Sequence, residues 1–135
     1  MAKGPKNPTP HTLGLIGMLI LQFLLGMFSA LFVEFPENAS EQQVWKFAGQ
    51  QIPVVLHMLL GLLLLLGAIA LVVRAIILKD KIWIWTSVIG LVGVLVADIT
   101  GVLFVGQQND IYSYAMAVAF IVALVAYFWG VYRAR

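Results

Sequence analysis

The sequence predicts an all-α integral membrane protein, an up-down-up-down four-helix bundle with both termini in the cytoplasm. The first observation is that four apolar stretches, each long enough to cross a bilayer as a helix, make up most of the 135 residues: 13–35, 54–78, 82–105 and 113–132. The second is composition, because hydrophobic residues are 62% of the chain and charged residues only 10%, against about 25% charged residues in soluble domains. The third is the placement of the basic residues.

Lysine and arginine gather on alternate connections between these spans. All but Lys46 precede the first span, lie near the end of the second span or between the second and third, or follow the fourth: Lys3, Lys6, Arg74, Lys79, Lys81, Arg133 and Arg135. Since basic residues concentrate on the cytoplasmic side, we expect a cytoplasmic tail over 1–12, one membrane domain over 13–132 and a cytoplasmic end at 133–135. The expected location is a prokaryotic cytoplasmic membrane, with lipid as the main partner. The net charge of +2 does not indicate nucleic-acid binding.

The connection over 36–53 is predicted to lie outside and to contain a short helix in the membrane interface. Ser40 followed three residues later by Gln43 matches a capping box, and Trp45 suits an interfacial anchor. Pro53 suits the first turn of the second span.

Each span carries one stripe of small or polar residues, which allows helices to approach closely in a membrane. Helical spacing aligns these stripes as Gln22, Gly26 and Ser29 in the first span, His57, Gly61, Leu64, Ala68 and Ala75 in the second, Ser87, Asp98 and Gly101 in the third, and Ala115, Ala119, Ala123 and Ala126 in the fourth. Short connections make the last three spans antiparallel neighbours. The stripes therefore predict the interior of the bundle.

Two ionisable residues inside the spans, His57 and Asp98, are the candidates for function, because such residues are costly in hydrocarbon. At about 1.5 Å per residue, both fall in the outer leaflet. One interpretation is a site in which His57 is a metal or haem ligand or carries a proton, with Asp98 as its orienting partner or proton acceptor. A second is a structural hydrogen bond between the two side chains, and a third is that Asp98 is simply protonated.

Haem usually requires two axial ligands, and His/His and His/Met pairs are both used. Met116 lies at a depth similar to that of His57, and a second His57 in a homodimer is the other route, although methionine is also ordinary packing material. Gln22 is expected to hydrogen-bond between helices, which is worth about 0.6–2 kcal/mol in membranes.

The segment Leu21-Gln22-Phe23-Leu24-Leu25-Gly26, followed after a loop by Leu56-His57-Met58-Leu59-Leu60-Gly61, resembles a helix pair of the haem A synthase family. The resemblance covers residues 13–79. Members of that family have eight helices in two four-helix halves, and their histidines ligate haem near the outer face. The resemblance implies that His57 ligates haem and that the face of Gln22 and Gly26 packs along the porphyrin. The fourth span lacks the second histidine of each family half, and no acidic residue matches the family's catalytic one, so no enzymatic activity is carried over.

The leading functional prediction is a small b-type haem protein or electron-transfer subunit, with His57 on the haem iron and Met116, Gln22, Gly26 and Gly61 in the cofactor-binding set. The alternative is a non-catalytic accessory subunit of a larger membrane complex, or a homodimer. A proton or solute pathway through Asp98 and His57 ranks last, because few polar residues continue toward the inner side. The absence of cysteine excludes thiolate metal sites and cysteine nucleophiles.

Overall fold

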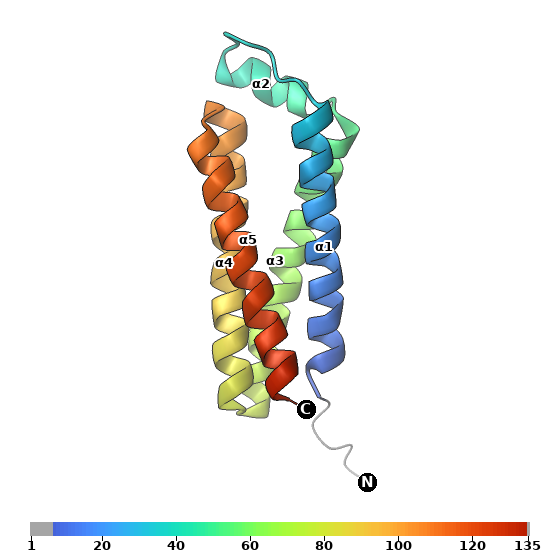
Figure 1. The fold of residues 1–135 in the computed structure, drawn as a ribbon, viewed down its shortest axis with the longest axis vertical. Helices are drawn as coiled ribbons and strands as arrows, with labels where there is room; N and C mark the ends of the chain where they lie inside the picture. Colours follow the sequence, from blue (N-terminus) through green and yellow to red (C-terminus); the bar gives the residue numbers. More distant parts are fainter. Residues whose placement is uncertain (1–6, 135) are drawn as a thin grey trace.

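The computed structural model describes residues 7–134, which form five helices: α1 (Thr9–Phe32), α2 (Glu41–Ala48), α3 (Ile52–Leu78), α4 (Lys81–Gln107) and α5 (Asp110–Arg133). The four long helices lie side by side, and the short α2 lies across one end of them (Figure 1). Each of the four is long and apolar enough to cross a membrane. The predicted all-α class and its four apolar helices are therefore confirmed.

The helix ends differ from the predicted spans by a few residues. α1 starts before Leu13 because Pro8 and Pro10 suit a helix start, where a missing N–H costs nothing. It ends at Phe32, and Pro36, four residues later, has no N–H to donate to the Phe32 carbonyl. Asp80 and Asn109 cap α4 and α5 by accepting hydrogen bonds from backbone N–H groups.

The short helix in the first connection is present with the predicted capping box. The Ser40 hydroxyl accepts from the Gln43 N–H, and the Gln43 side chain accepts from the Ser40 N–H. Val44 and Ala48 on its inner side are buried. They belong to an apolar cluster that joins α2 to the start of α3 at Val54 and to the end of α4 at Val105.

Helix pairing follows the order α1–α3–α4–α5, and α5 also packs against α1, so the four long helices form a closed ring. The main core lies away from α2 and includes Leu15, Leu64, Leu71 and Tyr127, which are all buried. α4 and α5 form the closest pair. A Cβ atom at Gly93 would lie 2.9 Å from the Ala119 carbonyl oxygen, so only glycine permits this approach.

The ring of helices is not equally closed along its length. The buried residues of α1 are Thr12, Leu15, Ile16 and Leu19, all in its first half, whereas α5 buries nothing before Ala119. α1 and α5 therefore contact each other in the half away from α2 and diverge toward α2 (Figure 1). The Phe23 and Phe120 rings, 5.5 Å apart, join the two helices near the point of divergence.

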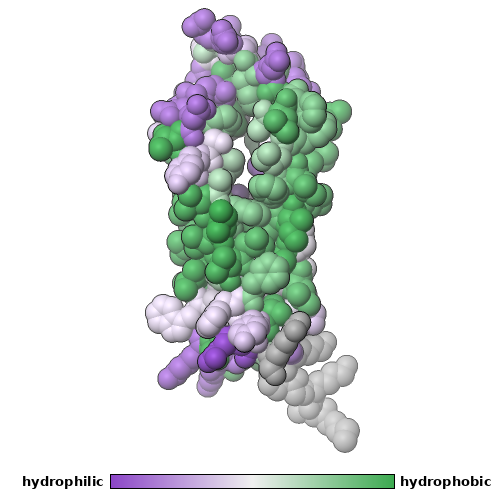
Figure 2. Space-filling model, viewed as in Figure 1, coloured by the Kyte–Doolittle hydropathy of each residue, from purple (hydrophilic) through white to green (hydrophobic). Residues whose placement is uncertain are grey.

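The surface has the pattern of a membrane protein. Figure 2 shows a broad hydrophobic band around the middle of the bundle and hydrophilic residues at both ends. Many large apolar side chains in the band are exposed, for example Leu31, Leu66 and Val125. In water these side chains would be a liability, but in a bilayer they face lipid.

Candidate functional site

His57 is held by α1 at two points, one for each ring nitrogen. Its Nδ1 lies 3.1 Å from the backbone carbonyl oxygen of Gln22. A carbonyl can only accept, so Nδ1 carries the proton and donates, and Nε2 keeps its lone pair. Nε2 lies 3.4 Å from the Gln22 side-chain nitrogen, which donates to it weakly. The predicted hydrogen bonding of Gln22 between helices is therefore confirmed.

Gly26 makes this arrangement possible. It lies one turn after Gln22 on α1, and a Cβ atom there would lie 2.9 Å from His57 Cε1. No real Cβ contact is that short, so the imidazole reaches the α1 backbone only because residue 26 has no side chain. The face of Gln22 and Gly26 thus contacts the imidazole of His57.

Gly61, one turn after His57 on α3, lets two other polar groups approach. A Cβ atom there would lie 3.0 Å from Asp98 Oδ1 and 3.2 Å from the Gln22 side-chain nitrogen. α1 and α4 are not neighbours in the ring, so their side chains meet across it over the bare backbone of Gly61. We call Gln22, His57 and Asp98 the polar cluster.

The hydrogen-bonding capacity of the polar cluster is only partly used. Gln22 Oε1 is buried and has no partner. Asp98 makes no hydrogen bond or ion pair within residues 7–134. The Ser29 hydroxyl, further along the same α1 face, is also buried without a partner. A buried polar group without a partner costs roughly 1–3 kcal/mol, which applies to the Gln22 oxygen and the Ser29 hydroxyl, whereas Asp98 is half-buried.

The structure therefore brings together five of the six predicted site residues: Gln22, Gly26, His57, Gly61 and Asp98. Met116 lies at the contact between α4 and α5, with its sulfur 3.3 Å from the Cβ position of Gly101. His57 lies at the contact between α1 and α3, so ligation by Met116 stays a prediction.

The interpretation that His57 and Asp98 hydrogen-bond to each other is wrong. The partner of His57 is Gln22 on both ring nitrogens, and Asp98 has none among the residues that the structure describes. A similar depth in the membrane suggested the His–Asp pair. The observed partner of Nδ1 is a backbone carbonyl of α1, and a backbone group leaves no signal in the pattern of side chains. A proton-carrying role for Asp98 stays a prediction.

The half of the bundle away from α2 contains packing rather than a polar path. Its buried polar side chains, Thr12, Thr86 and Ser87, donate to carbonyl oxygens of their own segment. Tyr127 packs against Gly90, and its buried hydroxyl has no partner. Sequence reasoning missed Tyr127, although a tyrosine amid alanines on one helix face is a signal for a ring packed against a glycine.

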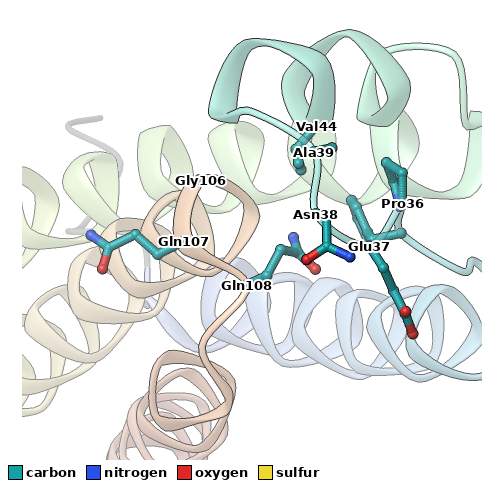
Figure 3. A pocket seen from close by; sticks show the side chains of 9 residues that line it. Pro36, Glu37, Asn38, Ala39, Val44, Gly106, Gln107 and Gln108 are labelled. Carbon is teal, nitrogen blue, oxygen red and sulfur yellow. The ribbon is translucent and has the colours of Figure 1, made fainter.

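A small pocket lies at the α2 end, with a volume of about 220 Å³. Figure 3 shows its lining, in which the side chains of Asn38 and Gln108 lie close to each other and the Glu37 carboxylate points away from Gln108. Glu37 is its only ionisable residue. One carboxylate that points away does not make a catalytic or metal site, so the pocket is a poorer candidate than the polar cluster.

Within the described part of the chain, no three His, Cys, Asp or Glu residues gather as a metal site would require. Comparisons with protein-family models, with curated proteins and with solved structures gave no significant match. The fold itself defines the class of the chain, because four helices suited to crossing a membrane make it a multi-pass membrane protein.

Proposed function

We propose that this chain is a small integral membrane protein of a prokaryotic cytoplasmic membrane that binds a b-type haem through His57 and transfers electrons. The proposed topology is up-down-up-down, with both termini in the cytoplasm and α2 on the outer side. The charge pattern supports this orientation, because Lys79, Lys81 and Arg133 lie at the end of the bundle away from α2 (Figure 1), where the positive-inside rule puts the cytoplasm.

The observation that carries the haem proposal is the hydrogen bond from His57 Nδ1 to the Gln22 carbonyl. Metal-ligating histidines almost always donate their other ring N–H to a carbonyl or carboxylate, which sets the tautomer and orients the ring. His57 has this arrangement before any metal binds. Haem, when bound, supplies one-electron exchange at its iron.

The residues around His57 fit this role in part. Nε2 keeps its lone pair but accepts a weak hydrogen bond from the Gln22 amide, so Gln22 would have to turn aside for iron to bind. The unpartnered Gln22 Oε1 indicates that little holds the amide in its present position. The second axial ligand in this proposal is Met116 or His57 of a second copy.

The test is the visible spectrum of the protein purified from cells supplied with haem. We expect a Soret band that His57→Ala removes and that His11→Ala, the matched control at the only other histidine, leaves in place. Met116→Leu distinguishes the second ligand, since a change in the α-band position supports Met116 and an unchanged spectrum supports a His57 pair. A wild-type protein without a Soret band refutes the proposal.

The alternative proposal is a non-catalytic accessory subunit of a larger membrane complex. The observation that favours it is the second half of α1, which has no buried residue and exposes large apolar side chains such as Leu31 and Phe32. A helix of another protein packed there would cover that surface. Native mass spectrometry from membranes should then show a stable complex, and a monomer without partners contradicts this alternative.

A further inference from the structure

The first step of the inference is an opening in the bundle between α1 and α5, on the side toward α2. No residue of α1 after Leu19 is buried, and no residue of α5 before Ala119 is buried. Figure 2 shows a hollow in the upper part of the hydrophobic band, with hydrophilic atoms visible inside it. In a bilayer a hollow in this band opens toward lipid hydrocarbon.

The polar cluster lies behind this opening. In the ring α1–α3–α4–α5, Gln22 and Asp98 extend from α1 and α4 and meet over Gly61 of α3. α3 therefore closes the back of the site, while the gap between α1 and α5 lies on the opposite side. The Phe23 and Phe120 rings, 5.5 Å apart, close the gap between α1 and α5 on the side away from α2.

The groups that lack partners at this site are oxygen acceptors. Gln22 Oε1 is buried and unpartnered, and the Asp98 carboxyl has no hydrogen bond in the described chain. A carboxyl group offers an acceptor oxygen in either protonation state. The buried Gln22 oxygen lacks a hydrogen-bond donor, and lipid hydrocarbon supplies none.

A suitable ligand must therefore donate hydrogen bonds and dissolve in the membrane. A cationic donor fits poorly, because charge is costly at this depth. A hydroxyl group is neutral and donates one hydrogen bond, and an aromatic ring can stack on the exposed Phe23 ring, as aromatic pairs prefer.

We propose that the polar cluster binds a lipid-soluble phenol, of which a quinol is one kind, that reaches Gln22 and Asp98 from the lipid through the gap between α1 and α5. The phenol hydroxyl donates to Gln22 Oε1 or to the Asp98 carboxyl, and the ring lies against Phe23. This site requires no iron, so it goes beyond the haem proposal and stands independently of it.

The experiment measures binding of tritiated decylhydroquinone to the full-length protein in lipid nanodiscs, kept under reducing conditions. The matched competitor is its dimethyl ether, which keeps the ring and chain but has no hydroxyl donor. We expect saturable binding that unlabelled decylhydroquinone displaces and that the ether displaces about tenfold less well, as the loss of one or two hydrogen bonds predicts. Equal displacement by both compounds, or no saturable binding, overturns the proposal.

Variants test the two acceptors separately. Loss of the acceptor that the hydroxyl uses should weaken binding about tenfold, so either Gln22→Leu or Asp98→Leu should do so, whereas Asp98→Asn keeps an acceptor oxygen and should stay within about threefold of wild type. Gln107→Leu, at the last residue of α4 and outside the polar cluster, is the control and should bind as wild type does. Folded leucine variants that bind as tightly as wild type overturn the proposal. If a variant does not fold, the ether comparison on the wild type still decides.

The same samples separate this proposal from the proposed function. A Soret band reports haem at His57, and tritium binding reports the phenol. Tritium binding without a Soret band supports the phenol site and refutes the haem proposal. A Soret band without saturable tritium binding supports the haem proposal and refutes the phenol site.

Discussion

Gly26→Ala is the substitution that most directly tests how His57 is held. A Cβ atom at this position would lie 2.9 Å from His57 Cε1, whereas ordinary contact begins at 3.4 Å. The α1 backbone cannot yield easily, so the imidazole must retreat by about half an ångström. Its Nδ1, now 3.1 Å from the Gln22 carbonyl oxygen, would then be roughly 3.6 Å away, which is beyond hydrogen-bonding distance.

The expected consequence is a change of tautomer. A net hydrogen bond is worth about 1 kcal/mol, and its loss removes about a fivefold preference for the proton on Nδ1. The assay is ¹⁵N NMR of the imidazole nitrogens in protein labelled at histidine and held at alkaline pH. The chain has only two histidines, so His11→Gln assigns the His57 signals.

The control is Gly17→Ala, because a Cβ atom there meets nothing within 4 Å. This variant should leave the His57 signals at their wild-type positions. An unchanged tautomer population in Gly26→Ala would show that the carbonyl of Gln22 does not hold the ring, and it would remove the main support for the haem proposal.

Three further predictions concern stability. Gly93→Ala forces a methyl group against the Ala119 carbonyl and should lower the free energy of unfolding by about 1–3 kcal/mol in SDS titrations of mixed micelles, whereas Gly14→Ala, with nothing within 4 Å, should not. Tyr127→Phe removes a buried hydroxyl that has no partner, so it should be neutral or stabilising by up to about 1 kcal/mol in the same titration; a large loss would reveal a hidden partner. Ser40→Ala removes the α2 cap, costs about 1 kcal/mol and should speed amide hydrogen exchange in α2 while the long helices stay protected; unchanged exchange would contradict the capping role.

The helices themselves were predictable because their signals are local. Hydrophobic length defines a span, and the pairing of Ser40 with Gln43 defines the start of α2. The inner faces were also predictable, since Gly61, Ala68 and Ala123 lie on small-residue stripes and are buried. In each case the information lies within one turn or one helix.

The partners across helices were less predictable. Depth along the helices placed His57 and Asp98 in one layer, but depth carries no information on how each helix is rotated about its axis or which helices are neighbours. His57 consequently meets Gln22, and Asp98 reaches the site only over Gly61. The carbonyl that orients His57 belongs to the backbone, which every residue has, so no sequence pattern identifies it.

The opening and the polar cluster have a common structural origin. The apolar cluster at the α2 end joins α2, α3, α4 and the segment after α1 through Phe35, but it includes no residue of α5. The first turns of α5 are therefore held mainly by α4, where Met116 lies against Gly101, while α1 is held to α3 through His57. The pair α1–α3 and the pair α4–α5 consequently separate toward α2, on the side between α1 and α5 where no apolar cluster joins them. The unpartnered oxygens of Gln22 and Asp98 lie between these pairs, so a ligand that bridges them would also join the two halves of the bundle, and its binding should raise the stability of the whole fold.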